Sequence, residues 1–276
     1  MILMKEYIEI IRPSIVFMAA LGVIIGAIIS KAEFLFVLIA AISAFLIAGA
    51  GIVVNDIYDY ETDKINFPNR PLPSKRMKKR NAIFYSVMLF ASGIFLAFLV
   101  NVYCFLLAIL NSFLEFMYAR NFKRIALIGN AIDSWFVSST FIFGYLASLK
   151  TVFVIKEAFV PILFVSLLAF LSNMGREIFG DIGDIEGDKK AGMKTLPIIT
   201  TKKFARIVAS IFIILAIVLS PLPFLLGFFS FVYLFIVFFA DILFLYSLFQ
   251  DPETNQKTTK IAMMLALLAF LLGSIF

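Results

Sequence analysis

Two stretches of the chain carry aspartates at helical spacing. In the first, residues 55–63 read N-D-I-Y-D-Y-E-T-D, which places Asp56, Asp59 and Asp63 at positions i, i+3 and i+7, with Asn55 in register with the last two. These positions share one face of a helix. The stretch follows a long apolar run, so the carboxylates lie at the C-terminal end of a helix, where its dipole disfavours anions. We therefore expect a divalent cation to hold them.

The second stretch, residues 176–189, repeats this spacing 125 residues later with Asp181, Asp184 and Asp188. The match predicts an internal repeat, and chance similarity between two acidic loops is the alternative. Because an even number of predicted membrane spans separates the two stretches, both open on the same face of the membrane. Together they predict one two-sided site.

The side chains in these stretches indicate the kind of metal. Oxygen ligands favour Mg²⁺, with Ca²⁺ as a possible alternative. The sequence has no His and one Cys, which disfavours zinc, copper and iron and excludes Ser-His-Asp catalysis. The two rows carry too much charge for one ion, so we expect two or more Mg²⁺ bridging a diphosphate. Arg70, in a loop stiffened by prolines, and Lys123 are the cations expected beside such phosphates.

The elements that position these residues are predicted to be membrane spans. The chain is 62% hydrophobic and contains 34 Phe, a composition that ordinary soluble proteins do not have. It predicts an all-α membrane protein of one domain, residues 1–276, with no separate soluble domain and no cleavable signal peptide. The nine predicted spans cover about 12–30, 34–58, 81–100, 102–119, 125–149, 157–180, 204–220, 223–248 and 259–276. Spans one to four and five to eight would be parallel repeats, with span nine added.

The distribution of basic residues predicts the orientation. With nine alternating spans, nearly all of the 24 Lys and Arg residues lie on the side of the N-terminus. Lys31, Lys150 and Lys156 lie on the other side, and Arg176 falls within a span. This bias predicts that the N-terminus and the site face the cytoplasm. The net charge of +6 therefore reflects topology, and no nucleic-acid partner is expected.

Several polar side chains fall inside predicted spans. They are Asn111, Glu115 and Tyr118 on one stripe of span four, Asn130 and Asp133 in span five, Arg176 in span six and Asp241 in span eight. They predict either the polar wall of a cavity or hydrogen bonds between helices. The remaining lining is Phe, Leu and Ile, which suits a long hydrocarbon substrate, because aromatic faces stabilise carbocations as they stabilise other cations.

The chain resembles the UbiA superfamily of intramembrane prenyltransferases over nearly its whole length. The match consists of the two aspartate rows, the loop 69–73, Tyr118 with Lys123, and the stretch 195–197. The resemblance implies helices around a central apolar cavity, capped by cytoplasmic loops, with an isoprenyl diphosphate held through Mg²⁺. The expected metal ligands are Asn55, Asp59, Asp63, Asp184 and Asp188, with Asp56 and Asp181 as further ligands or supports behind them. The residues expected to bind substrate are Arg70, Lys123, Tyr118, Asn66, Arg176, Arg12 and Asn111.

Within the superfamily, residues 63–74 look most like the archaeal branch that joins a second C20 chain to geranylgeranylglyceryl phosphate through an ether bond. Lys75 departs from that pattern, which usually continues with Gly. The resemblance implies that Asp59, Asp63, Asp184, Asp188 and Lys123 carry catalysis: the diphosphate leaves while Mg²⁺ and the cations stabilise it, and the acceptor hydroxyl attacks C1 in a cavity sheltered from water. Candidates for the acceptor's phosphate are Arg12, Lys189, Lys190 and Lys194.

Two other functions are open from the sequence. The first is prenyl transfer to an aromatic acceptor, such as 4-hydroxybenzoate or another quinone precursor, or to a chlorin. The second is transport of a divalent cation or a phospholipid, which would need a polar path through both faces of the membrane. The predicted partners are an isoprenyl diphosphate, a lipid phosphate acceptor and membrane lipids, with no obligatory protein partner.

Overall fold

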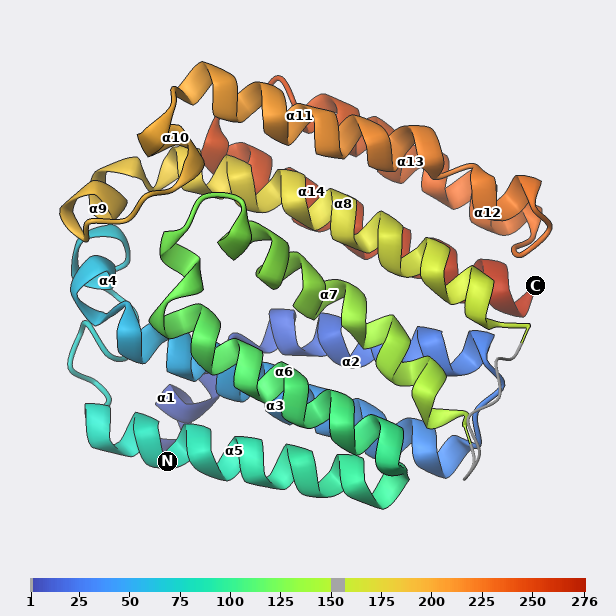
Figure 1. Cartoon of the computed structure of the whole chain (residues 1–276), viewed down its shortest axis with the longest axis horizontal. Coiled ribbons are helices and arrows are strands. Elements are labelled where there is room, and N and C mark those ends of the chain that lie inside the picture. Colours follow the sequence, from blue (N-terminus) through green and yellow to red (C-terminus); the bar gives the residue numbers. More distant parts are fainter. Residues whose placement is uncertain (1, 150–156) are drawn as a thin grey trace.

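The computed structural model of the chain describes residues 2–149 and 157–276. In chain order its helices are α1 (Ile2–Ile10), α2 (Pro13–Ile29), α3 (Phe34–Tyr58), α4 (Tyr60–Asn66), α5 (Lys79–Val100), α6 (Val102–Arg120), the 3₁₀ turn η1 (Phe122–Arg124), α7 (Ile128–Ala147), α8 (Phe159–Gly183), α9 (Ile185–Lys190), α10 (Leu196–Ile199), α11 (Lys202–Leu219), α12 (Leu222–Leu225), α13 (Phe231–Ser247) and α14 (Pro252–Ile275). The long helices lie side by side along the longest axis, and the short helices α4, α9 and α10 gather at one end (Figure 1).

Several of these helices can cross a membrane. Within residues 2–149 and 157–276, six spans are long and apolar enough: α3, α5, α6, α8, the stretch from Lys202 to Leu225, and α14. The apolar helices α2 and α13 are shorter. Phe84, Phe98 and Phe113 point outward and are exposed, as expected of side chains that lipid covers. The chain is therefore a multi-pass membrane protein. Each of the nine predicted spans overlaps a helix, but the number that cross the bilayer stays a prediction.

The predicted borders are wrong at three places. Lys123 and Arg124 do not begin span five but lie in η1, because Leu127 adopts a left-handed φ of 62° before α7 starts. Span eight is divided into α12 and α13 around Gly227, whose φ is 76°. The last helix begins at Pro252 rather than near 259, because Asp251 caps it by accepting from two backbone N–H groups at 3.1 Å. The predicted joint Lys150–Glu157 lies outside the described residues, apart from Glu157.

A short helix, α1, precedes the first predicted span and was not expected. It ends before Arg12, which has a left-handed φ of 50°. Pro13 then opens α2, where its missing N–H costs no helical hydrogen bond. The corner turns the Arg12 side chain toward α3, which matters for the site.

The two aspartate rows lie where helices meet end to end. Asp59 closes α3 and opens α4, and Asp184 holds the same place between α8 and α9. Backbone hydrogen bonds continue across both joints, from Asp63 N to Asp59 O at 2.7 Å and from Asp188 N to Asp184 O at 3.0 Å. Each row therefore keeps a nearly helical register through a joint, instead of lying on one unbroken helix. α3 and α8 are both 25 residues long.

The two halves of the bundle meet closely where α2 crosses α7. A side chain at Gly26 would collide with the backbone of Phe141, and one at Gly144 would collide with the backbone of Val23 and Ala27. Small residues allow such an approach between membrane helices. The close crossing brings α2 and α7 together beside the space that α3 and α8 border.

Candidate active site

A cavity of about 1000 Å³ lies inside the bundle. Both aspartate rows border it, through Asn55, Asp59, Asp63, Asp181, Asp184 and Asp188. Its apolar wall includes Ile15, Met18, Ile47, Phe136, Phe141, Leu168, Phe244 and Phe270. The cavity therefore joins a strongly acidic end to a space that suits a hydrocarbon chain.

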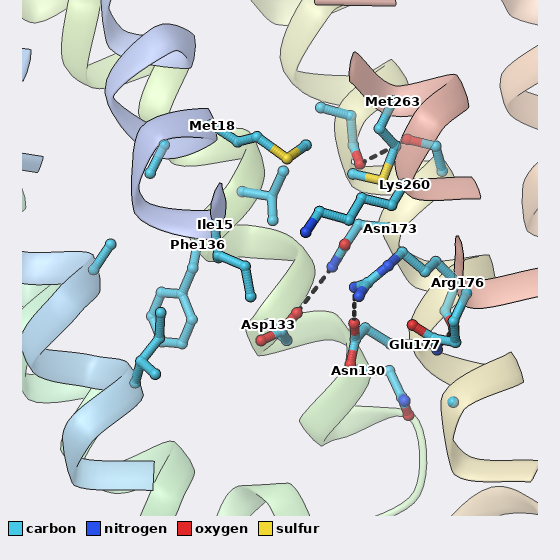
Figure 2. A pocket seen from close by; sticks show the side chains of 18 of the residues that line it. Ile15, Met18, Asn130, Asp133, Phe136, Asn173, Arg176, Glu177, Lys260 and Met263 are labelled. Atoms are coloured by element: carbon cyan, nitrogen blue, oxygen red, sulfur yellow. Dashed lines mark hydrogen bonds and ion pairs between the residues drawn. The ribbon is translucent and has the colours of Figure 1, made fainter. Parts of the chain in front are cut away.

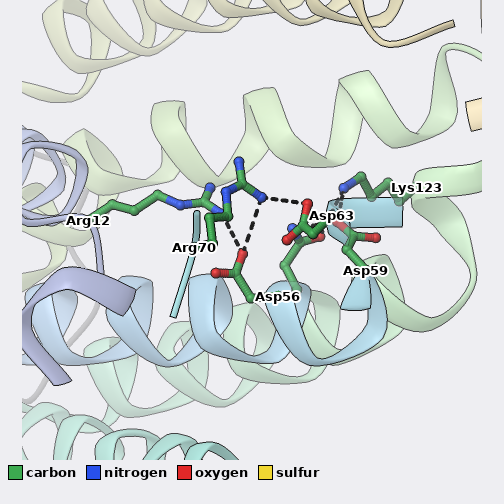
Figure 3. Close-up of polar contacts among 7 residues, drawn as sticks. Arg12, Asp56, Asp59, Asp63, Arg70 and Lys123 are labelled. Carbon is green, nitrogen blue, oxygen red and sulfur yellow. Dashed lines mark hydrogen bonds and ion pairs between the residues drawn. The ribbon is translucent and has the colours of Figure 1, made fainter. Parts of the chain in front are cut away.

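Lys123 connects η1 to the first aspartate row. Its ammonium forms an ion pair with Asp59 and lies 3.4 Å from Asn55 Oδ1 (Figure 3). Asn55 in turn donates its Nδ2 hydrogen to Asp59 at 2.9 Å. A cation predicted to bind diphosphate thus contacts two residues predicted to bind metal.

Arg70 and Arg12 neutralise the rest of this row. Arg70 Nη1 donates to Asp63 Oδ1 at 2.7 Å and lies 3.7 Å from Asp56 Oδ1 (Figure 3). Its guanidinium also lies 3.8 Å over the ring of Phe67. Arg12 forms an ion pair with Asp56. Asp56 is 1% exposed and does not border the cavity, so it lies behind the site as a countercharge to the two arginines.

The second row has different partners. Asn130 Nδ2 donates to Asp181 at 2.9 Å. Among the described residues, no Lys or Arg lies within ion-pair distance of Asp184 or Asp188, although Lys123 and Arg70 act on Asp184 from farther away. The predicted phosphate candidates Lys189, Lys190 and Lys194 are exposed and do not border the cavity. The geometry therefore gives no support for those three as binders of the acceptor.

Contacts between the loops hold the two rows against each other. A side chain at Gly187 of α9 would collide with the amide of Asn66 at the end of α4, so Asn66 packs between the rows. Ala126 N donates to Lys194 O at 3.0 Å, and Lys194 N donates to Arg124 O at 2.9 Å. These bonds fix the turn that carries Lys123 against the chain that follows the second row.

The donor set fits a hard divalent cation. Asp63 Oδ2 is buried, and within the described part of the chain it has no hydrogen-bond partner, which leaves a carboxylate oxygen available as a ligand. Among the described residues, however, no three acidic, His or Cys side chains are already grouped around one point. Asp59 and Asp63 are turned onto Lys123 and Arg70 instead. Metal binding must therefore compete with these ion pairs.

Burial and neighbouring charges of opposite sign shift the pKa values of Lys123 and Asp63 in opposite directions. Burial lowers the pKa of Lys123, but the carboxylates of Asp59 and Asp63 together raise it above its ordinary value, so the ammonium stays charged. Burial raises the pKa of Asp63 against the opposing charge of Arg70. Burial, together with the neighbouring Asp184 carboxylate, raises the pKa of Asp188 to about 6. The second row therefore holds protons at a higher pH than isolated aspartates do.

Metal binding is expected to weaken as the pH falls through about 6. A carboxylate must lose its proton to bind a metal, and the pKa of Asp188 in the folded protein is about 6, raised from 3.8. Affinity for Mg²⁺ should be constant above that pH and drop by about tenfold at pH 5. Calorimetric titration of Mg²⁺ into the purified protein at pH 5 and pH 7.5 measures this, and equal affinities would contradict it.

The loop that carries Arg70 contains one strained residue. Lys75 has a left-handed φ of 62°, at the position where the resemblance leads one to expect Gly. Ser74 N and Met77 N close the turn by donating to Arg70 O at 3.1 Å and Pro71 O at 3.0 Å. The turn therefore forms although a lysine is unfavourable in this left-handed conformation.

Replacing Lys75 by Gly should stabilise the protein. A non-glycine residue in this conformation costs about 1–2 kcal/mol, part of which Gly offsets by losing more chain entropy on folding. We expect a net gain of about 0.5–1 kcal/mol, or roughly 1–4 °C in melting temperature. Thermal unfolding in detergent measures it. Lys75→Ala keeps the backbone strain and serves as the control. If Lys75→Ala stabilises the protein as much as Lys75→Gly does, relief of backbone strain is not the cause.

The polar side chains predicted inside the spans border the cavity and also bond between helices. Asn111 Nδ2 donates to Ser139 Oγ at 3.0 Å and its Oδ1 accepts from Trp135 Nε1 at 2.9 Å. Asp133 accepts from Asn173 Nδ2 at 2.9 Å (Figure 2). These residues therefore line the cavity and also form hydrogen bonds between helices, the two roles that the sequence left open. Further polar residues on the wall are Glu115, Tyr118, Asn130, Arg176 and Asp241.

Three residues on the wall were not predicted. Glu177 forms an ion pair with Arg176, and Asn173 lies one turn before Glu177 on α8. Lys260 borders the cavity from α14. Asn173, Glu177 and Asp181 follow one another at i, i+4 and i+8, a stripe that the sequence could have indicated. Lys260 lies at the edge of predicted span nine, where the sequence analysis counted it only toward the basic bias of one side.

Comparison with known proteins gives three findings. The model of the UbiA prenyltransferase family matches residues 15–273. A digeranylgeranylglyceryl phosphate synthase from Methanosphaera stadtmanae is 37% identical over 99% of this chain and 100% of its own length. A similar synthase from Methanococcoides burtonii is 38% identical over 98% of this chain and 100% of its own length.

Solved structures resemble the fold along its whole length. A digeranylgeranylglyceryl phosphate synthase structure is 36% identical, covers 100% of this chain and 99% of that chain, and has a TM-score of 0.76. A UbiA homologue from Archaeoglobus fulgidus, bound to GPP and Mg²⁺, has a TM-score of 0.74 at 17% identity and covers 98% of this chain and 100% of that chain. At 17% identity, the similarity to the Archaeoglobus fulgidus homologue supports a shared fold and nothing more.

Proposed function

The chain belongs to the UbiA prenyltransferase family, and we propose that it transfers a geranylgeranyl group from geranylgeranyl diphosphate to the glycerol hydroxyl of geranylgeranylglyceryl phosphate. The product is digeranylgeranylglyceryl phosphate, an intermediate of archaeal ether lipids. The observation that carries the proposal is the meeting of two aspartate rows, Lys123 and Arg70 at one end of an apolar cavity. The choice of acceptor follows the synthases that match along the whole chain.

The diphosphate is proposed to bind at the acidic end of the cavity. Asn55, Asp59, Asp63, Asp184 and Asp188 would hold Mg²⁺, supported by Asp56 from behind the site and by Asp181 on the cavity wall. Mg²⁺ bound there supplies positive charge to the diphosphate oxygens as they become more negative. A divalent metal agrees with the Archaeoglobus homologue bound to GPP and Mg²⁺.

Lys123 and Arg70 are proposed to hold the leaving group. Both already border the cavity beside Asp59 and Asp63, so their hydrogen bonds can pass from carboxylate to phosphate oxygens with little movement. They stabilise charge that grows as the allylic C–O bond breaks and its electron pair leaves with the diphosphate. The hydrogen bonds between the η1 turn and Lys194 fix the position of Lys123.

The remaining wall shelters the allylic cation and receives the hydrocarbon. Tyr118 stacks edge-on against Phe136 at 6.0 Å, and both border the cavity. Aromatic faces stabilise a cation, and the apolar wall keeps water from capturing it. The glycerol oxygen then forms the new bond to C1 and releases its proton.

The membrane side on which the site lies and the internal repeat of the bundle are also part of the proposal. The basic bias of the loops supports a site on the cytoplasmic side of a nine-span bundle. Equal lengths of α3 and α8 and matching joints at Asp59 and Asp184 support two parallel repeats, with α14 added. In that arrangement each repeat contributes one aspartate row.

The direct test is an acceptor assay. Purified protein with Mg²⁺ and geranylgeranyl diphosphate should release pyrophosphate and form the ether product when geranylgeranylglyceryl phosphate is added. Turnover with 4-hydroxybenzoate alone would move the protein to the aromatic branch. The absence of turnover with either acceptor, in protein that binds geranylgeranyl diphosphate, would contradict the proposal.

A further inference from the structure

A second cationic patch lies on the cavity wall, apart from Lys123 and Arg70. It consists of Arg176 on α8 and Lys260 on α14, which both border the cavity. Figure 2 shows their cationic heads directed into the same part of the cavity, beside Asn173. The charge of Arg176 acts unfavourably on Lys260, so two like charges are held close together. We call them the Arg176–Lys260 patch.

The partners of the two cations differ. Arg176 forms an ion pair with its neighbour Glu177, and Gln256 Nε2 donates to its backbone oxygen at 2.8 Å. Lys260 Nζ donates to Ser14 Oγ on α2 at 2.8 Å. Ser14 is neutral, and within the described part of the chain Lys260 has no carboxylate at ion-pair distance. The patch therefore contains one cation without a countercharge.

This is unusual among the cations around the cavity. Arg12, Arg70 and Lys123 all pair with aspartates. Lys257, one turn before Lys260, pairs with Glu253 at 2.7 Å. Lys260 is half-buried in the third turn of α14, and its hydrogen bond to Ser14 is exposed. An uncompensated lysine that borders a cavity, next to an arginine, is suited to an anion that comes from outside the chain.

The proposed reaction involves two different phosphates. The diphosphate has Lys123, Arg70 and the aspartate rows at its end of the cavity. The acceptor carries a phosphate monoester. Lys189, Lys190 and Lys194 are exposed and do not border the cavity, and Arg12 borders it beside the first aspartate row, where it pairs with Asp56. Ile15, Met18 and Met263 lie beside the patch (Figure 2) and offer apolar surface for the acceptor's chain.

We propose that Lys260, together with Arg176, binds the phosphate monoester of the lipid acceptor at the meeting of α2, α8 and α14. The inference rests on the proposed function. Ser14 lies in the first turn of α2 and accepts a hydrogen bond from Lys260. An incoming phosphate would take the place of the Ser14 hydroxyl on the ammonium.

The test compares acceptors with and without the phosphate. Wild-type protein, Lys260→Met, Lys260→Arg and the control Lys203→Met are assayed in a non-ionic maltoside detergent free of lipid. Lys203 is exposed and does not border the cavity. We expect Lys260→Met to raise KM for geranylgeranylglyceryl phosphate by about tenfold or more, and Lys260→Arg to restore most of the loss. KM for geranylgeranyl diphosphate should stay within about twofold.

Geranylgeranylglycerol, which lacks the phosphate, provides the second arm. Lys260→Met should use it as well as the wild type does. An unchanged KM for the phosphorylated acceptor, or an equal rise for the diphosphate, would overturn the inference. An effect that appears only in phosphatidylglycerol vesicles would assign the patch to bilayer headgroups and would also overturn it. If the wild type turns over no phosphorylated acceptor, the proposed function itself fails.

Discussion

Asp59→Asn and Asp184→Asn are each expected to reduce turnover by about 10³-fold, because each removes a charged oxygen from a proposed ligand of the metal–diphosphate site. The two residues lie at matching joints, one in each aspartate row, and both border the cavity. Asn keeps the shape of the Asp side chain but removes its negative charge. The measurement is the Mg²⁺-dependent release of pyrophosphate from geranylgeranyl diphosphate in the presence of acceptor. Higher Mg²⁺ should restore part of the rate, because the loss is one of metal affinity.

The chain supplies a matched pair of controls. Glu61 and Glu186 stand two residues after Asp59 and Asp184, are exposed, and do not border the cavity. Glu61→Gln and Glu186→Gln should keep turnover within about twofold of the wild type. Melting temperatures in detergent show whether all four variants fold. Turnover within about tenfold of the wild type in both Asp variants would remove the basis for the two-row site.

Lys123→Met is expected to have two effects of opposite sign. Turnover should fall by about 10²–10³-fold, because a donor to the leaving diphosphate is lost. Binding of Mg²⁺ to the protein without substrate should tighten by about tenfold, because the ammonium no longer competes with the metal for Asp59. The competition follows from the ion pair between Lys123 and Asp59. Pyrophosphate release and calorimetric titration of Mg²⁺ measure the two effects.

Arg124→Met is the control for this variant. Arg124 follows Lys123 in η1, but its side chain is exposed and does not border the cavity. Its backbone oxygen, which holds the turn, is unchanged by the substitution. A fall in both turnover and metal affinity for Lys123→Met would show instead that the lysine only holds the turn in place.

Much of the fold was predictable because membrane spans are local in sequence. The apolar run of α3 ends at Tyr58 as predicted, and α5 and α6 meet at Asn101, whose side chain caps α6 by accepting from Cys104 N at 2.9 Å. The family and the prenyltransferase activity predicted from the aspartate rows are confirmed by the comparisons. The metal ligands and the cytoplasmic orientation stay predictions.

The wrong borders share one physical cause. A hydropathy pattern records how apolar a stretch is, but not where the backbone changes direction. Leu127 and Gly227 interrupt helices through positive φ, and Asp251 starts one in a polar stretch through its side chain. Backbone conformation and capping decide such places, and they depend on single residues.

The two aspartate rows, their spacing and the apolar helices that carry them could be predicted from the residue order, because these features depend on residues a few positions apart. Which charges meet could not be predicted in this way, because it depends on contacts between distant helices. Asp56 pairs with Arg12 across 44 residues, and Asp59 pairs with Lys123 across 64. Lys260 reaches Ser14 across 246 residues. Such pairs depend on how the helices pack. This packing separates Asp56 from the cavity, and it leaves Lys260 without a carboxylate at ion-pair distance among the residues that the structure describes.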